Sequence, residues 1–158
     1  QEVVGSQFVI RIPFKIDEEH KNERVKESAS ASIEGLSVLL VEDNELNMEI
    51  ARFIIENEGS RVTCATNGKE AVDIYKNAPE SFDIILMDIM MPEMDGYEAT
   101  RMIREMDLNV PIVAMTANAF AEDKIKAKKA GMNAHVSKPL DKDILIRVIS
   151  KLCGYKSV

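Results

Sequence analysis

The amino-acid sequence predicts an α/β domain with a doubly wound parallel sheet, and two observations support this fold class. From Ile33 onward, five apolar runs of strand length each come before a segment whose apolar residues recur at helical spacing. The central run, residues 82–88, is apolar without polar alternation, which is typical of a strand that is covered on both faces. Strands that alternate with helices form parallel sheets through right-handed crossovers, so we expect five strands with helices on both faces.

Three strands and two helices are expected between residues 36 and 88. The strands are the apolar runs at residues 36–41, 61–65 and 82–88. The first helix is indicated by four apolar residues at helical spacing, and Gly59 is placed to end it; the four are Leu46, Ile50, Phe53 and Ile54. The turn at residues 66–68 leads into the second helix, whose apolar residues are Ala71, Val72 and Tyr75.

Three helices and two strands are expected after the central strand. The helices are predicted at residues 97–106, 121–130 and 142–152, and the strands at residues 110–115 and 134–136. On the first of these helices, Met102, Ile103 and Met106 share one side. Gly131 is placed to stop the second helix, which is rich in lysine, and Asp141 is placed to cap the third.

The chain divides into three parts. Residues 1–16 show partial apolar–polar alternation from Phe8 onward, which predicts a single strand without a core of its own. Residues 17–32 are rich in charged residues, serine and alanine, which is the composition of a linker. The folded domain is expected to comprise residues 33–158. Because the chain begins at Gln1 without a methionine, we expect it to be a fragment of a longer protein.

Composition and charge exclude several classes of partner. Hydrophobic residues make up 46% of the chain and charged residues 30%, as in globular proteins that fold in water. The net charge of -7 argues against general binding to nucleic acid or to an anionic membrane, and no apolar run is long enough to span a bilayer. Cys64 and Cys153 are isolated, which fits a reducing compartment. We therefore expect a cytoplasmic location, although the parent protein could be anchored in a membrane.

Polar side chains follow four of the predicted strands. Glu42 and Asp43 come after the first strand, Asp88 ends the third, Thr116 follows the fourth and Lys138 follows the fifth. Each of them alone could be a helix cap or a turn residue. Because the carboxyl ends of parallel strands lie along one edge of the sheet, we expect these side chains to converge there.

The chemistry of this group is that of a phospho-aspartate site. Three clustered carboxylates repel one another unless a cation joins them, and their hard oxygen ligands suit Mg²⁺. A lysine beside the ion can balance phosphoryl charge, and a threonine hydroxyl can donate to a phosphoryl oxygen. A carboxylate can itself accept a phosphoryl group, so we assign Asp88 as the nucleophile.

Four segments of the chain resemble the receiver domain of two-component response regulators: residues 38–44, 83–96, 114–117 and 137–139. The similarity covers residues from about 35 to 154. It implies a flavodoxin-like fold with strand order 2-1-3-4-5. It also implies that Asp88 accepts a phosphoryl group from a phosphohistidine. Mg²⁺ would then be held by Glu42, Asp43, Asp88 and the main-chain carbonyl of Met90, while Thr116 and Lys138 sense the phosphoryl group.

The resemblance also implies roles for residues beside this site. The family usually has tyrosine or phenylalanine three positions before the lysine, as a switch that changes rotamer, and this chain has His135 there. His135 could serve as this switch or could be an ordinary, partly exposed histidine. Met90 and Asn118 lie two positions beyond Asp88 and Thr116, where family members tune the lifetime of the phosphoryl group; both could instead simply pack the loop. Pro139 completes the Ser-Lys-Pro motif.

The amino-terminal segment suggests what the parent protein is. Residues 5–14 resemble the last strand of the ATP-binding domain of histidine kinases, which implies a hybrid sensor histidine kinase with a receiver at its carboxyl end. The expected partners are a phosphohistidine donor domain and a histidine phosphotransfer protein. The receiver would catalyse its own phosphorylation and dephosphorylation. The alternative is a non-enzymatic module that regulates the attached kinase.

Other classes of protein fit the motifs less well. A haloacid-dehalogenase-like phosphatase would have a second acid two residues after the nucleophile, where this chain has Met90. A flavin or nucleotide site would have a glycine-rich or hydroxyl-rich first loop, and the acids at 42 and 43 would repel phosphate. A DNA-binding regulator would need a further basic domain.

Overall fold

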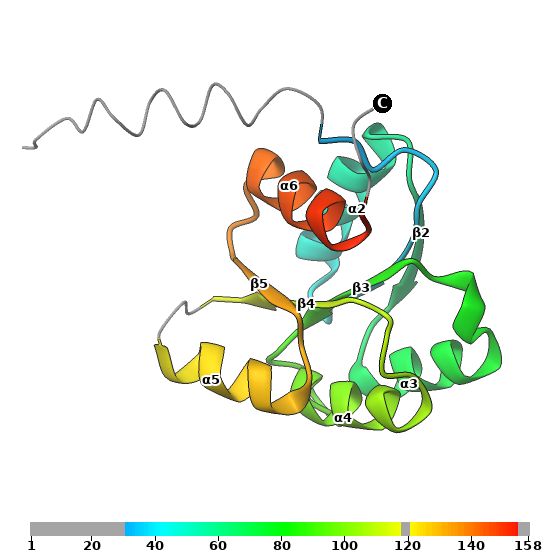
Figure 1. Ribbon diagram of the computed structural model, residues 1–158. Helices are drawn as coiled ribbons and strands as arrows, with labels where there is room; N and C mark the ends of the chain where they lie inside the picture. The colour runs from blue at the N-terminus through cyan, green and yellow to red at the C-terminus, as the bar shows by residue number, and fades with distance from the viewer. Residues whose placement is uncertain (1–30, 118–120, 155–158) are drawn as a thin grey trace, which may run out of the picture. The chain divides into compact units, whose positions relative to one another are not determined.

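The computed structural model describes residues 31–117 and 121–154, and the expected five-stranded parallel sheet is present within them. Its strands are β1 (Ser37–Val41), β2 (Arg61–Ala65), β3 (Ile84–Asp88), β4 (Ile112–Thr116) and β5 (Ala134–Ser137). They are ordered β2-β1-β3-β4-β5, which confirms the predicted order 2-1-3-4-5 (Figure 1). The described residues belong to one compact unit, Ala31–Val158. The strand expected at 1–16, and all but the end of the linker expected at 17–32, lie outside the described residues.

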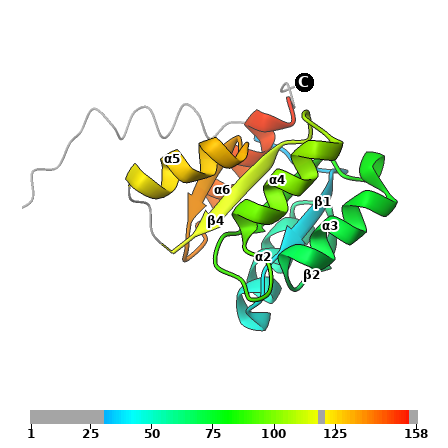
Figure 2. The same cartoon turned by 90° about the horizontal axis from the view of Figure 1, so that it is seen from below.

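Helices cover both faces of the sheet. They are α2 (Glu45–Asn57), α3 (Gly68–Asn77), α4 (Gly96–Met106), α5 (Ala121–Ala130) and α6 (Lys142–Leu152), with a short 3-10 helix at Pro79–Ser81. Helices α2 and α6 lie on one face, and α3, α4 and α5 lie side by side on the other (Figures 1 and 2). Among the described residues, no helix combines the length and the apolar character that crossing a membrane requires.

The inner strands β1, β3 and β4 are buried on both faces, as the absence of polar alternation predicts, whereas the edge strands β2 and β5 are partly exposed. On β1, Val38 and Leu40 belong to the core cluster formed with α2 and α6. Leu39 and Val41 belong to the cluster formed with α3 and α4. All four side chains are fully buried. Burying one aliphatic side chain of this size stabilises the fold by about 1.5–3 kcal/mol, so the side chains of β1 contribute strongly to the stability of the sheet.

The apolar residues whose spacing predicts α2 do not form its buried face. Three of the four are exposed: Leu46 and Phe53 at 68% and Ile50 at 46%, whereas Ile54 packs partly against the core. The buried face consists of Met48, Ala51 and Ile55. Both sets recur at helical spacing, so the sequence pattern alone does not distinguish them. Asn44 fixes where the helix starts, because its side chain accepts the main-chain N–H of Asn47, and the connection to β1 then decides which side meets the sheet.

Helix α4 shows the same kind of difference. Of the three residues that were expected on one side, Ile103 is fully buried, while Met102 and Met106 are each about two-fifths exposed. The buried face consists of Gly96, Ala99, Thr100 and Ile103. Small residues allow α4 to lie close to the sheet and to α3, which explains why the larger methionines point away.

The parallel register brings the strand ends to the same edge of the sheet. Val41, the last residue of β1, is aligned with Met87 of β3. Asp88 is aligned with Met115 of β4, and Thr116 is aligned with Ser137, the last residue of β5. The polar residues that end or follow these strands are therefore held in one row, as expected from the parallel topology.

Candidate functional site

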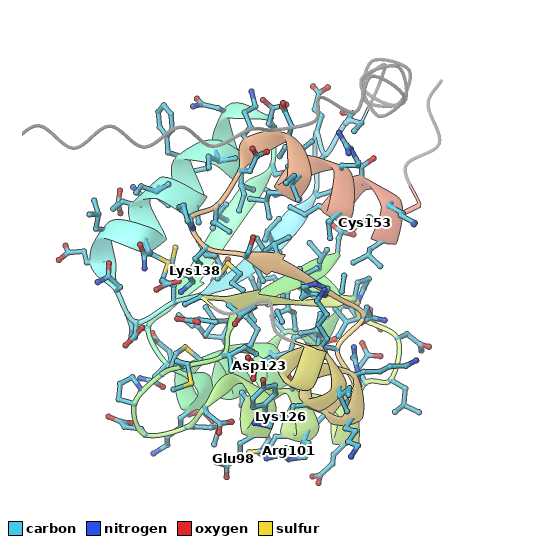
Figure 3. The ribbon with its side chains drawn as sticks, turned by 90° about the vertical axis from the view of Figure 1, so that its left-hand side faces the viewer. Glu98, Arg101, Asp123, Lys126, Lys138 and Cys153 are labelled. Atoms are coloured by element: carbon cyan, nitrogen blue, oxygen red, sulfur yellow. The ribbon has the colours of Figure 1, made fainter. Side chains whose placement is uncertain are left out.

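Three predicted site residues meet in direct contact at this edge of the sheet. Glu42 directly follows β1, Asp88 ends β3 and Lys138 directly follows β5. The Nζ atom of Lys138 lies 2.5 Å from Oε2 of Glu42 and 2.7 Å from Oδ2 of Asp88. Figure 3 shows Lys138 at the end of the sheet, between the helix layer that contains α2 and the layer that contains α5. The predicted convergence of these three side chains is confirmed.

The contacts of Lys138 control its charge. Burial alone would lower the pKa of the ammonium group, but the hydrogen bonds and the negative charges of Asp88 and Glu42 outweigh burial and raise the pKa. Lys138 is therefore a permanent cation at neutral pH. Glu42 and Asp88 are only 2% and 4% exposed, so each of these carboxylates depends on the ammonium group for charge compensation.

The acidic cluster has the geometry of a metal site. Carboxylate oxygens of Glu42, Asp43 and Asp88 all lie within 4.8 Å of one another. Glu42 and Asp88 are buried, whereas Asp43 is exposed at the mouth of the site. Lys138 already places one positive charge against two of the three acids, so negative charge in the cluster is partly compensated within the chain. Oxygen ligands of this kind suit a hard divalent ion, so these residues could hold a metal.

The loop after β3 contacts Asp88, the predicted nucleophile. The main-chain N–H of Met90 donates to Oδ1 of Asp88 at 3.3 Å, so the two carboxylate oxygens have different partners. The side chain of Met90 is 78% exposed. At Gly96, a Cβ atom would lie 2.1 Å from the main-chain oxygen of Asp88, so only glycine fits at the start of α4. The roles predicted for the carbonyl and the side chain of Met90 stay predictions.

Thr116 and His135 line one cleft between β4, β5 and α5, together with Tyr97, Asp123 and Lys124. His135 is partly buried, and burial together with the positive charge of Lys124 lowers its pKa. Figure 3 shows Asp123 on the side of the sheet where α5 lies. Thr116 is also tied to the lysine, because the main-chain N–H of Lys138 donates to the carbonyl of Thr116 at 2.8 Å. A switch at His135 stays a prediction, and Asn118 lies outside the described residues.

A second hollow lies beside Lys138. It is lined by Glu42 and Asn47, by Ile50 of α2, and by Lys138, Pro139 and Leu140. The Lys138–Pro139 peptide bond is cis. The hollow therefore joins two residues of the site, the buried Glu42 and the partly buried Lys138, to the exposed apolar side of α2.

The sequence analysis missed one residue in contact with the site, Asn47. Its side-chain Nδ2 donates to Oε1 of Glu42 at 3.1 Å. A polar residue in the first turn of the helix that follows two acids was the available signal, but such residues usually cap the helix or face water.

Comparison with known proteins identifies relatives of the chain. A family model described as the response regulator receiver domain matches residues 38–150. "Hybrid signal transduction histidine kinase I" of Dictyostelium discoideum is 40% identical over 126 residues, which cover 75% of this chain and 7% of the relative. "Probable histidine kinase 6" of Oryza sativa is 35% identical over 138 residues, which cover 75% of this chain and 14% of the relative. The chain thus spans only a small part of these relatives.

Two solved structures are similar to the chain. One is the receiver domain of sensor histidine kinase PA1611 from Pseudomonas aeruginosa, with a magnesium ion in its active site cleft. It is 38% identical, with a TM-score of 0.71, and the match covers 76% of this chain and 98% of that one. The other is the receiver domain of Ssk1 from Saccharomyces cerevisiae, in complex with the histidine phosphotransfer protein Ypd1. It is 31% identical, with a TM-score of 0.71 and coverage of 77% and 90%.

Proposed function

The chain belongs to the family of response regulator receiver domains, and from this membership we propose that it accepts a phosphoryl group from a phosphohistidine onto Asp88. One observation carries the proposal: Asp88 is a buried carboxylate that shares the ammonium group of Lys138 with Glu42, inside a cluster of three acids. Phosphoryl transfer requires a nucleophile and a cation that compensates the negative charge of the phosphoryl group. A buried carboxylate beside a fixed ammonium group provides both.

The transfer exchanges one bond for another. A carboxylate oxygen of Asp88 forms a bond to phosphorus while the bond from phosphorus to the donor imidazole nitrogen breaks, and its electron pair stays on that nitrogen. Held by Glu42, Asp43 and Asp88, with the Met90 carbonyl as the further predicted ligand, Mg²⁺ would neutralise charge on Asp88 and on the phosphoryl oxygens. The ammonium group of Lys138 balances the remaining negative charge. The hydroxyl of Thr116, at the end of the neighbouring strand, donates to a phosphoryl oxygen.

The donor and the acceptor of the phosphoryl group follow from the relatives. The chain corresponds to a small part of proteins named histidine kinases, so we place it in a hybrid histidine kinase whose phosphohistidine is the donor. The similarity to a receiver that was crystallised with a histidine phosphotransfer protein supports onward relay to a protein of that kind. Transfer requires the partner's histidine to lie in line with Asp88, so the partner must cover the mouth of the site.

The exposed apolar side of α2 is the surface that suits such a partner. Leu46, Ile50 and Phe53 lie on this helix, which begins three residues after Glu42, and Ile50 also lines the hollow beside Lys138. Large apolar side chains next to the site mouth provide the desolvated contact that a docked phosphotransfer protein needs.

Phosphorylation is tested directly by mass. The wild-type chain, incubated with Mg²⁺ and a small phosphodonor such as acetyl phosphate, should gain the mass of one phosphoryl group. The Asp88→Asn variant should not gain it, whereas Asp73→Asn, which changes an exposed acid on α3, should behave as wild type. A phosphoryl adduct on Asp88→Asn would contradict the assignment.

Docking is tested with Ypd1 as the probe. Replacing Ile50 by serine should weaken binding of Ypd1 by tenfold or more, because truncation of a buried anchor costs at least about 1–2 kcal/mol. Ile125→Ser changes an isoleucine of similar exposure on α5, in the opposite helix layer, and should leave the affinity unchanged. Equal effects of the two substitutions would rule out the α2 surface.

A further inference from the structure

We propose that Asn47 is a positioning residue for Glu42, and through it for the metal site; the proposal rests on the function proposed above. The two carboxylate oxygens of Glu42 have separate partners. Nδ2 of Asn47 donates to Oε1 at 3.1 Å, and Lys138 contacts Oε2 at 2.5 Å. Asn47 therefore determines the orientation of the carboxylate, and Oε2 is the oxygen left on the side of Lys138 and Asp88.

The fold holds Asn47 firmly enough for this role. Asn47 lies in the first turn of α2, and its main-chain N–H donates to the side chain of Asn44 at 3.0 Å. Its side chain is half-buried in the hollow beside Lys138. The main-chain N–H of Asn47 thus takes part in the helix cap, and its side-chain amide donates to Glu42. Replacing the side chain alone keeps the capping hydrogen bond and removes only the contact with Glu42.

An amide is the suitable donor at this position. Glu42 is only 2% exposed, and a buried carboxylate oxygen without a hydrogen bond is costly. A charged donor would satisfy the oxygen but would add a second permanent cation beside Lys138, which would repel a divalent ion. The amide of Asn47 satisfies the oxygen without charge. Hydrogen bonds of this kind to a ligand carboxylate typically change metal affinity by about 10–100-fold when they are lost.

The first test measures Mg²⁺ binding to the full chain by NMR titration and by thermal shift. Asn47→Leu should raise the apparent Kd for Mg²⁺ by about tenfold or more. Asn57→Leu makes the same change on the exposed last residue of α2 and should leave Kd unchanged. Asn47→Gln keeps an amide donor and should recover most of the affinity. An unchanged Kd in a folded Asn47→Leu protein would overturn the proposal.

The second test asks whether Asn47 acts through Glu42. In a Glu42→Ala background, which removes both side-chain oxygens, replacing Asn47 by leucine should produce no further change in Kd, because the carboxylate that it orients is already gone. Additive effects of the two substitutions would show that Asn47 acts by another route and would overturn the proposal. If Asn47→Leu does not fold, Asn47→Gln and Asn57→Leu are compared with wild type in each background. Asn47→Gln should then have a Kd close to that of wild type. A shift in Kd for Asn47→Gln that exceeds the shift for Asn57→Leu and persists without Glu42 would overturn the proposal.

A kinetic readout separates positioning from a general loss of structure. With acetyl phosphate, the Mg²⁺ concentration that gives half-maximal phosphorylation should rise about tenfold in Asn47→Leu, while the rate at saturating Mg²⁺ stays within about twofold of wild type. A fall in the saturated rate with an unchanged half-maximal Mg²⁺ concentration would overturn the proposal. If the wild-type chain bound no Mg²⁺, the proposed function would fail first, which is a distinguishable result.

Discussion

The ammonium group of Lys138 lies between two carboxylates that are almost fully buried, Glu42 and Asp88. It does for these acids what a bound divalent ion would also do, because both place positive charge between them. Removing one member of a buried ion pair leaves the other charges uncompensated, which is far more costly than breaking a pair at the surface. The lysine and a metal ion should therefore partly substitute for one another in stabilising the fold.

Replacing Lys138 by methionine tests this substitution. In the absence of metal, the free energy of unfolding should fall by about 3 kcal/mol, because two buried carboxylates lose their cation. Mg²⁺, which binds only the folded state, should then raise the melting temperature of the variant more than that of wild type. Both values are measured by thermal denaturation with and without Mg²⁺.

Lys142 provides the control for this experiment. Lys142→Met breaks the ion pair with Glu58, which involves an exposed lysine at the start of α6, and should change stability little. Similar losses in the free energy of unfolding for Lys138→Met and Lys142→Met would contradict the argument. An equal rise in melting temperature with Mg²⁺ for Lys138→Met and wild type would also contradict it.

We expect His135 to make the stability of the fold depend on pH. Burial, and then the charge of Lys124, hold its pKa below the ordinary value of 6.5. The unfolded chain therefore binds more protons than the folded chain just below pH 6.5, so the contribution of His135 to stability is complete above that pH and is lost as the pH falls. In His135→Tyr this loss is absent. As the pH falls from about 7.5 to about 5.5, the melting temperature of the variant should therefore rise relative to that of wild type.

Comparing the two proteins at each pH isolates this residue. Carboxylates whose pKa is lowered in the folded state, such as Asp107 beside Tyr75, lose stabilisation at lower pH in both proteins alike. A difference in melting temperature that does not vary with pH would show that His135 does not carry the effect.

At the scale of one element, α2 carries apolar residues on two sides with different purposes. Ile55 is fully buried against the sheet, whereas Ile50, on the same helix, is 46% exposed. Ile55→Ala should reduce the free energy of unfolding by about 2–5 kcal/mol, because it removes buried methyl groups and leaves a cavity. Ile50→Ala should cost under about 1 kcal/mol. Chemical denaturation of the matched pair measures both values, and equal losses would mean that the exposed side of α2 also packs in solution.

The same helix shows why the sequence predicts some features and not others. The strands could be predicted because residues such as Leu39 and Leu40 are apolar whichever face they meet. The convergence of Glu42, Asp88 and Lys138 could be predicted because parallel topology alone aligns strand ends. The buried side of α2 could not, because two apolar stripes compete and the packing of the helix on the sheet selects one. The contact of Asn47 with Glu42 depends on that same placement, so it too appears only in the folded structure.

At the scale of the whole molecule, the fold should be independent of the amino-terminal segment. Both core clusters draw their described residues from Ile33 onward. We therefore predict that deleting residues 1–27 leaves a chain that unfolds cooperatively, with a melting temperature within a few degrees of the full chain, and that still gains a phosphoryl group from acetyl phosphate.

Deleting residues 142–158 provides the contrasting truncation. It removes α6 and with it the core residues Leu145, Ile146 and Ile149, so cooperative unfolding should be lost. If the amino-terminal deletion also abolished cooperative unfolding, residues 1–27 would have to contribute to the core of this unit.

The strand order has a consequence for the newly made protein. Asp88 and the lysine that contacts it are 50 residues apart in the chain, and β5, which delivers the lysine, is the last strand of the sheet. While the chain is being synthesised, both acids leave the ribosome well before Lys138 does. A nascent chain that ends before β5 has the carboxylate of Asp88, the proposed acceptor, but not the cation that contacts it. If the proposed function is correct, phosphoryl capture should therefore become efficient only after the last strand has joined the sheet.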